Sequence, residues 1–255
     1  MCKLVSLTLT PLKQIPLIRQ GERLTDILLN ALTQNGISLE DNDILVLAQK
    51  IVSKAEGRMV RLADVSPTPR ALELAAQSGK DPRVVELILQ ESNEVVRARF
   101  GSIIVEHRLG FICANAGIDQ SNVSGDSETA LLLPLNPDKS AKEIRAALEK
   151  TTGKRIGVMV IDSHGRAWRI GTVGMCIGLS GLPALIDERG WKDLFGYTLK
   201  ITIVGVADEL AAAASLMMGQ AAEGAPVVHV RGFPYPLGEG SLAELLRPKE
   251  QDMFR

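Results

Sequence analysis

The stretch Ile156-Gly157-Val158-Met159-Val160-Ile161 decides the fold prediction, because it is apolar throughout and runs directly into Asp162-Ser163-His164-Gly165-Arg166. A short apolar run without polar alternation is typical of a strand that is buried on both faces. A second apolar run, Phe111 to Ile118, is followed in the same way by Asp119 and then by Asn122. The pattern predicts rigid, buried strands that end in acidic residues.

Carboxylates at the ends of such strands suit a particular kind of ligand. With amide and hydroxyl neighbours, they can bind a hard divalent cation that in turn holds substrate phosphates. Asp119 and Asp162 are therefore candidate metal ligands, with Asn122 and Ser163 beside them. The alternative is that each aspartate only forms a turn, because Asp and Asn stabilise turns through their own side chains. Spacing alone leaves both interpretations open.

The remaining patterns predict a mixed α+β fold rather than a doubly wound parallel sheet. Gly36, Gly79 and Gly153 are expected to end helices, and Ser140 with Glu143 forms a capping box. The elements follow no strict βαβ order, and two of the strands form a hairpin. Strands are expected over residues 5–9, 43–47, 102–106, 110–114, 156–161, 198–204 and 227–230, and helices over 24–32, 70–78, 140–148 and 208–218, with one more that begins at 81–82.

Length and composition limit the classes of protein. The chain has 255 residues, of which 45% are hydrophobic and 23% charged, and 29 Lys and Arg stand against 30 Asp and Glu. This balance disfavours nucleic acid and anionic membranes as partners. The longest uncharged stretch, from Ile170 up to Asp187, is shorter than the roughly 20 residues of a membrane helix. The N-terminus lacks a signal-peptide pattern, so we expect a cytoplasmic protein in which residues 1–255 form a single module of one domain or two lobes.

Several familiar catalytic signatures do not occur in the sequence. It contains no Gly-x-x-x-x-Gly-Lys-Ser/Thr phosphate loop, no Gly-x-Gly-x-x-Gly and no Gly-x-Ser-x-Gly. The three cysteines form no Cys-x-x-Cys pair, so they are expected to be reduced and mostly buried, and the three histidines lack the spacing of a zinc site. These six residues are Cys2, Cys113, Cys176, His107, His164 and His229.

Two further segments could contact phosphate. Lys50 and Lys54 would share one face of a helix, where phosphate oxygens would relieve the repulsion between them, although two solvated surface lysines are an equal alternative. Gly219 and Gln220, followed by Glu223, could present backbone and side-chain amides to a ligand, although a helix cap also explains the glycine.

Taken together, these motifs resemble the coenzyme F420-0:L-glutamate ligase family, whose members add γ-linked glutamates to a deazaflavin coenzyme. The resemblance extends from about Ile15 to Gly232, and the string Asn-Ala-Gly-Ile-Asp-x-Ser-Asn is long enough to be specific. The segments that carry it are Ile44 to Arg58, Gly110 to Val123, Leu132 to Pro134, Asp162 to Arg166 and Ala207 to Ala211.

The resemblance implies an enzyme, its cofactors and its architecture. It implies a GTP-dependent amide ligase with Mg²⁺ or Mn²⁺ at two sites, K⁺ as a further candidate ion, and L-glutamate and the deazaflavin precursor as substrates. An acyl-phosphate intermediate follows, which requires no protein nucleophile. The implied fold is a two-lobed α+β fold with largely antiparallel sheets in an intertwined homodimer, in the stand-alone form without a fused nitroreductase-like domain.

The resemblance also assigns roles to individual residues. It implies Lys54, Asp119 and Asp162 as catalytic residues, and Asp119, Asp162, Ser163 and Gln220 as metal ligands. The implied nucleotide contacts are Ile15, Pro16, Leu17, Ile18, Gln49, Lys50, Lys54, Asn122, Met218, Gly219, Gln220, Ala221, Ala222, Glu223, Gly224 and Ala225.

The sequence departs from the family pattern at a few positions. Gln49 stands where Ser or Thr is common, Ser163 stands where Thr is common, and the glycine-rich segment Ile170 to Ser180 has no acidic residue. Two alternatives therefore stay open: the same chemistry on another carboxylate acceptor, and a non-catalytic protein that binds the nucleotide or the deazaflavin.

Overall fold

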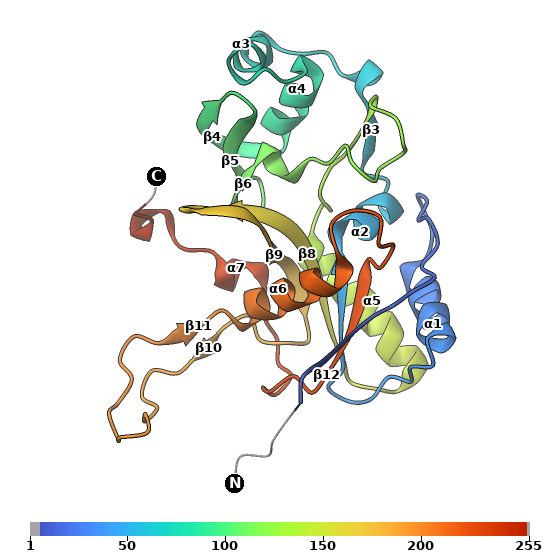
Figure 1. Ribbon diagram of the computed structural model, residues 1–255, viewed down its shortest axis with the longest axis vertical. Helices are drawn as coiled ribbons and strands as arrows, with labels where there is room; N and C mark the ends of the chain where they lie inside the picture. The colour runs from blue at the N-terminus through green and yellow to red at the C-terminus, as the bar shows by residue number, and fades with distance from the viewer. Residues whose placement is uncertain (1–5, 254–255) are drawn as a thin grey trace.

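The computed structural model describes residues 6–253, and a five-stranded sheet in the order β1-β12-β2-β8-β9 forms its centre (Figure 1). Strands β2 and β8 are parallel, and the other neighbouring pairs in this sheet are antiparallel. The predicted α+β class with largely antiparallel sheets is thereby confirmed. The strands are β1 (Thr8–Pro11), β12 (Val227–Arg231), β2 (Ile44–Ala48), β8 (Gly157–Arg166) and β9 (Arg169–Ser180).

Helices cover both faces of this sheet, which explains why its middle strands are apolar throughout. Val158 and Val160 of β8 pack into the cluster on one face, with helices α1 (Leu24–Gln34), α2 (Gln49–Ala55) and α5 (Pro137–Thr152). Met159 and Ile161, which point the opposite way, pack into the cluster on the other face with α6 (Val206–Met218). The short helix α7 (Leu242–Leu245) lies against β9.

Residues 59–131 form a segment with a hydrophobic cluster of its own, drawn at the top of Figure 1. The chain enters and leaves it through the antiparallel pair β3 (Met59–Arg61) and β7 (Thr129–Leu131). The cluster lies between two helices and a three-stranded antiparallel sheet. Its elements are η1 (Leu62–Asp64), α3 (Pro69–Ser78), α4 (Pro82–Gln90), β4 (Ser92–Arg99), β5 (Ser102–His107), β6 (Ile112–Ala114) and η2 (Asn115–Gly117).

A long hairpin projects from the body of the molecule at the lower left of Figure 1, and we call residues 186–204 the arm. Its base is the pair β10 (Ile186–Asp187) and β11 (Ile203–Val204). The prediction of a strand over 198–204 is therefore wrong for most of its length. Leu199 and Thr202 make backbone hydrogen bonds to the facing side of the arm and Thr198 forms one isolated bridge to Lys192, but these contacts do not form a continuous ladder. Near the C-terminus lies η3 (Lys249–Gln251).

Most helix ends agree with the sequence patterns. Gly79 and Gly153 adopt the left-handed conformation directly after α3 and α5, and Asp81 caps α4 by accepting from the Arg83 amide at 2.8 Å. The capping box predicted at Ser140 and Glu143 is wrong. Helix α5 begins one turn earlier, because the side chain of Asn136 accepts from the amide of Lys139 and Pro137 occupies the first turn.

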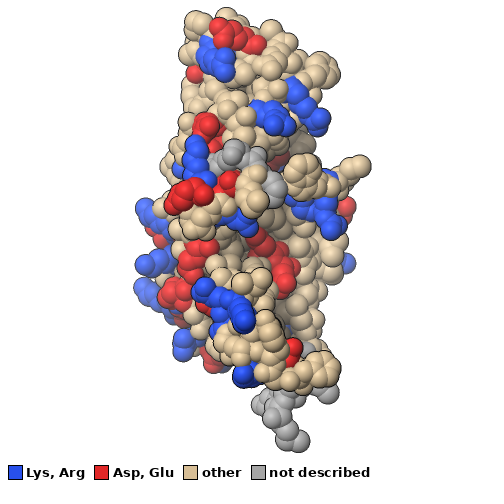
Figure 2. All heavy atoms as spheres, turned by 90° about the vertical axis from the view of Figure 1, so that its left-hand side faces the viewer, with Lys and Arg blue, Asp and Glu red and all other residues tan. Residues whose placement is uncertain are grey.

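The thiols agree with the prediction as far as the structure describes them. Cys113 and Cys176 are free and buried, whereas Cys2 lies outside the described residues. Burial raises the pKa of the Cys113 thiol to about 12, so this thiol is un-ionised at neutral pH. None of the helices in residues 6–253 combines the length and apolar character of a bilayer crossing. Charges of both signs are interspersed on the face in Figure 2.

Candidate functional site

A cleft of about 1300 Å³ lies where β2, α2 and β8 meet the loops that follow η2 and α6. Such a volume exceeds the usual range of roughly 300–1000 Å³ for single-ligand pockets, so it has room for more than one substrate. All residues that the sequence implied for the nucleotide and the metal line this cleft: Ile15 to Ile18, Gln49, Lys50, Lys54, Asp119, Asn122, Asp162, Ser163 and Met218 to Ala225.

Asp119 reaches the cleft through a left-handed turn rather than at the end of a strand. Strand β6 ends at Ala114, and the next three residues have φ values of 53°, 53° and 64°. Asn115 tolerates this conformation, and its Oδ1 accepts from the backbone amide of Ile103 at 3.1 Å. Asp119 and Leu131 of β7 then exchange backbone hydrogen bonds of 3.0 and 2.8 Å. The expectation that the strand continues to Ile118 is wrong, but the predicted rigid support is present.

Asp162 lies within β8, not after it. The predicted strand end at Ile161 is wrong, because β8 continues to Arg166 and pairs with β9 along its length. The register shifts between Val160 and Ile161, where β9 has an extra residue. Such bulges re-aim side chains and are common beside active sites. The carboxylate of Asp208 in α6 stabilises the bulge by accepting from the amide of Cys176 at 2.9 Å.

The glycines of β9 allow helices to pack closely on this strand. A Cβ atom at Gly174 would lie 2.5 Å from the carbonyl oxygen of Ala211 in α6, and one at Gly178 would lie 2.4 Å from Pro137 in α5. Packing therefore accounts for these two glycines in the segment that lacks an acidic residue.

The charge of Asp119 is only partly balanced within the protein. Its Oδ2 accepts from Nε2 of Gln49 at 2.7 Å and lies 3.2 Å from Nζ of Lys50. Burial and the nearby charge of Asp162 nevertheless raise the pKa of Asp119, because they outweigh the two partners. The carboxylates of Asp119 and Asp162 thus favour an additional positive charge between them.

Lys50 and Lys54 lie above the loop that carries Asp119. Nζ of Lys50 donates to the carbonyl of Ser121 at 2.9 Å, and Nζ of Lys54 donates to the carbonyl of Asn122 at 2.8 Å. Within residues 6–253 Lys54 makes no ion pair, and burial together with the charge of Lys50 lowers the pKa of Lys54. The lysines share one face of α2, as predicted, and they line the cleft rather than an open surface.

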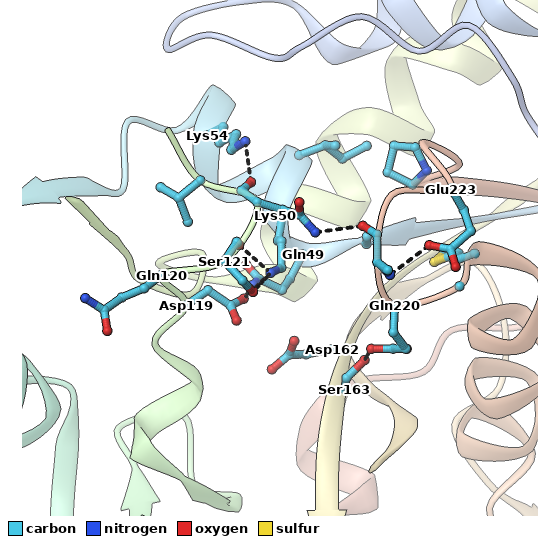
Figure 3. A pocket seen from close by; sticks show the side chains of 18 of the residues that line it. Gln49, Lys50, Lys54, Asp119, Gln120, Ser121, Asp162, Ser163, Gln220 and Glu223 are labelled. Atoms are coloured by element: carbon cyan, nitrogen blue, oxygen red, sulfur yellow. Dashed lines mark hydrogen bonds and ion pairs between the residues drawn. The ribbon is translucent and has the colours of Figure 1, made fainter. Parts of the chain in front are cut away.

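The loop after α6 closes the opposite side of the cleft, as Figure 3 shows. Oγ of Ser163 donates to Oε1 of Gln220 at 2.9 Å, and Nε2 of Gln220 lies 3.1 Å from Oγ of Ser215. The side chain of Asn122 donates to the carbonyl of Ala221 at 2.9 Å, which joins this loop to the one that follows Asp119. Residues far apart in sequence therefore form one continuous wall.

The donor set fits a hard divalent cation that is shared with a substrate. Among residues 6–253 no three His, Cys, Asp or Glu side chains are grouped as a complete protein site. Asp119 and Asp162 supply two carboxylates, and the oxygens of Ser163 and Gln220 lie beside them (Figure 3). Mg²⁺ is usually held by one or two carboxylates together with substrate phosphates, so an incomplete oxygen site of this kind is what it requires.

Sequence reasoning missed some residues of the site and left others undecided. Ser53, which is fully buried, donates to Oε1 of Gln49 at 2.8 Å. The spacing of four residues in a helix is the signal that could have found this contact. His164, which the sequence did not place in the site, lies 3.1 Å from Asp162. Nothing in the sequence indicated that residues 123–127 also line the cleft.

Paired carboxylates, two lysines and a cleft for more than one substrate are typical of enzymes that transfer phosphoryl groups with the help of a metal ion. Comparison with known proteins is more specific. The sequence model of the family described as F420-0:Gamma-glutamyl ligase matches residues 13–232. The chain belongs to this family.

Curated relatives match almost end to end. A protein of Methanothermobacter thermautotrophicus named coenzyme F420:L-glutamate ligase is 46% identical over 98% of this chain and 100% of its own length. Proteins with the same name from Methanocaldococcus jannaschii (47% identical, 95% of this chain, 94% of the relative) and Archaeoglobus fulgidus (43% identical, 96% and 95%) are similar to the same extent.

Proposed function

We propose that this protein is a GTP-dependent amide ligase that joins L-glutamate to the deazaflavin coenzyme F420-0, in one or more γ-linked additions, through an acyl phosphate. The observation that carries the proposal is the pair Asp119 and Asp162, set beside Lys50 and Lys54 in a cleft of about 1300 Å³. The names of the relatives supply the acceptor and the amino acid.

The reaction has two steps, and both balance without a protein nucleophile. A carboxylate oxygen of the acceptor attacks the γ-phosphorus of GTP, the bond from that phosphorus to the β-phosphate oxygen breaks, and GDP leaves. The deprotonated amine of glutamate then attacks the acyl carbon, and inorganic phosphate leaves as the amide forms. The work left to the protein is positioning and charge stabilisation.

The residues of the cleft are suited to that work. The ammonium groups of Lys50 and Lys54 lie side by side on α2, where they would bind phosphate oxygens and stabilise the charge that shifts toward GDP. We propose that residues 15–18 and 218–225 hold the nucleotide, because both segments line the same cleft as the lysines. Asn122 connects the two sides through its bond to Ala221.

Asp119, Asp162, Ser163 and Gln220 would hold Mg²⁺ or Mn²⁺, with K⁺ as a further candidate ion. A bound divalent cation would supply Lewis-acid stabilisation of the phosphoryl oxygens. Deprotonated Asp119 is needed for such binding, and the raised pKa of Asp119 favours a cation as its partner.

We also propose that the protein is an intertwined homodimer and that the arm lies in its interface. The arm exposes large apolar side chains that the rest of the chain leaves uncovered: Trp191, Leu194, Phe195, Tyr197 and Ile201, with Leu194 98% and Phe195 94% exposed. Contiguous exposed apolar patches mark interaction sites. The molar mass measured by light scattering is expected to be twice 27.5 kDa, and Leu194→Asp with Phe195→Asp is expected to halve it.

The direct test of function is a mass measurement. The protein is incubated with GTP, Mn²⁺, L-glutamate and F420-0, and the acceptor is followed by mass spectrometry. We expect acceptor heavier by one or more glutamyl units, only when GTP and metal are both present. An unchanged acceptor despite GTP binding would contradict the proposal and direct attention to another carboxylate acceptor or to a role in binding alone.

A further inference from the structure

Each aspartate of the proposed metal site is held at one oxygen by a buried side chain. Gln49 is 1% exposed, and its Nε2 donates to Oδ2 of Asp119 at 2.7 Å. His164 is 8% exposed, and its Nε2 lies 3.1 Å from Oδ2 of Asp162. Lys50 also approaches Oδ2 of Asp119, at 3.2 Å. Among residues 6–253 Oδ1 of neither aspartate accepts a hydrogen bond from the protein.

The orientation of the Gln49 amide is fixed by its own surroundings. Oγ of Ser53, fully buried, donates to Oε1 of Gln49 at 2.8 Å. If the amide were flipped, the NH₂ group would face the Ser53 hydroxyl and the oxygen would face the Asp119 carboxylate, which repels it. Because the Asp119 carboxylate can only accept, it fixes Nε2 of Gln49 toward itself, and Oε1 is left to accept from Ser53, although Gln49 and Asp119 are 70 residues apart.

The ring of His164 is fixed in a comparable way. His164 lies two residues after Asp162 in β8, so both side chains project from the same face of the strand. Its ring packs against Phe111 with centroids 5.2 Å apart, and Phe111 stacks on His107 at 5.0 Å. Because a carboxylate oxygen can only accept, Nε2 of His164 carries the proton in this contact.

We propose that Gln49 and His164 are positioning residues, which hold Oδ2 of Asp119 and of Asp162 so that Oδ1 of each aspartate is oriented to bind the divalent cation. This inference rests on the proposed function, because it takes the two aspartates as metal ligands. A carboxylate that is already oriented loses less conformational freedom when a cation binds. In this arrangement Gln49 has a role that Ser or Thr could not fill, because either side chain is too short to reach Asp119 from α2.

The test measures Mn²⁺ binding, not turnover. Free Mn²⁺ is counted by electron paramagnetic resonance during titration of the protein without substrates. Removing a hydrogen bond to a metal ligand typically weakens metal binding 10–100-fold, so we expect about this loss in Gln49→Leu and in His164→Leu. His164→Gln is expected to restore most of the affinity, because its amide N–H can occupy the place of the ring Nε2–H. If His164 only supported the fold, a single amide donor at this position would not restore the Mn²⁺ affinity.

A matched control separates this effect from general damage to the fold. His229 lies 2.8 Å from another buried carboxylate, that of Asp43, and does not line the cleft. His229→Gln is expected to leave the Mn²⁺ affinity unchanged. If His164→Leu does not fold, His164→Asn replaces it, because its shorter amide does not reach Asp162 and should bind Mn²⁺ more weakly than His164→Gln.

Failure of the inference and failure of the proposed site give different results. If wild type binds Mn²⁺, Asp119→Asn does not, and the folded Gln49 and His164 variants bind as wild type does, the positioning inference is overturned and the metal site stands. If Asp119→Asn binds Mn²⁺ as tightly as wild type, the metal site itself is wrong and the inference falls with it.

Discussion

Two groups of carboxylates in this protein, one buried and one half-buried, have opposite electrostatic character. Asp43 is 1% exposed, and its two carboxylate oxygens accept hydrogen bonds from the Arg231 guanidinium at 2.9 and 2.7 Å. Nε2 of His229 lies 2.8 Å from Oδ2 of Asp43. Burial alone would raise the pKa of Asp43, but Arg231 and His229 outweigh it and hold that pKa well below its usual range. Asp119 is the reverse, because burial and Asp162 raise its pKa despite Gln49 and Lys50.

Glu91 belongs with Asp43 rather than with Asp119. Burial would raise its pKa, but His107, Arg108 and Arg58 lower it to about 2. Arg108 also donates to the carbonyl oxygens of residues 134 and 135, so this network joins the 59–131 segment to the chain that follows it. Ion networks that support the fold are balanced internally, whereas the pair in the cleft is not. We take that difference as support for the metal site proposed in the cleft.

Asp119→Asn is the change with the largest expected effect. Metal-dependent turnover should fall by about 10³-fold or more, because the variant loses several kcal/mol of charge stabilisation and 1.36 kcal/mol corresponds to a factor of ten. Urea unfolding of the metal-free variant should show stability no lower than that of wild type, because the substitution removes an unfavourable charge. Full turnover, or a large loss of stability, would contradict the view that Asp119 serves the reaction whereas Asp43 supports the fold.

Asp43→Asn should lower the stability of the protein but leave its Mn²⁺ binding unchanged. The change removes the charged acceptor of Arg231 and of buried His229, and losing hydrogen bonds to a charged group costs about 1.5–3 kcal/mol. Arg231 is 39% exposed and keeps its ion pair with Glu40 at 2.7 Å, which limits the loss. We expect a lower urea midpoint and, in the protein that remains folded, Mn²⁺ affinity within about twofold of wild type, well below the factor of ten that 1.4 kcal/mol represents. Weaker Mn²⁺ binding without a loss of stability would contradict the structural role of Asp43.

Lys54→Met tests whether Lys54 binds the phosphates of the nucleotide. Removing a single charge-stabilising donor typically costs about 10²-fold in turnover. The Mn²⁺ affinity without GTP should not weaken, because Lys54 makes no ion pair with either aspartate. The matched change Lys139→Met, in an exposed pair on α5, should leave turnover unchanged. Equal turnover in the two variants would remove Lys54 from the mechanism.

The pH dependence of Mn²⁺ binding and of stability should also distinguish Asp119 from Asp43. The pKa of Asp119 is raised, so Mn²⁺ affinity should decrease as pH falls through this pKa, approaching a factor of about ten per pH unit below it. The same shift destabilises the metal-free protein as pH rises from about 3.8 through that pKa. The lowered pKa of Asp43 has the other sign, because its contribution to stability is present above pH 3.8 and is lost only as pH falls further. Mn²⁺ titrations of wild type at several pH values check the first point, and urea unfolding of metal-free wild type and Asp119→Asn at the same pH values checks the second. Equal pH dependence of stability in the two proteins would contradict the raised pKa of Asp119.

Local signals in the sequence predicted the parts of the fold that are locally determined. The Asp81-Pro82 start of α4, the Gly79 and Gly153 stops and the 102–114 hairpin all depend on residues close together in the chain. The far half of β8 was missed, because polar and glycine residues there look like a turn. What makes it a strand is its pairing with β9, and Gly174 and Gly178 of β9 are explained only by the helices that pack on them.

The candidate site could be predicted as a set of residues but not as a network. Family resemblance and the acids after apolar runs brought out Asp119 and Asp162. The contact between Gln49 and Asp119 joins positions 70 residues apart, and no pattern within either segment indicates it. The contact between His164 and Asp162 is local, with a spacing of two, and could be read once that segment was known to be a strand.

A crystal soaked with Mn²⁺ and GTP would test the central claim most directly, because anomalous scattering locates the ion in the presence of both groups of carboxylates. The account predicts an anomalous peak bonded to Asp119 and Asp162, with none at Asp43 or Glu91. A peak elsewhere in the molecule, with Asp119 and Asp162 still free of metal, would contradict it.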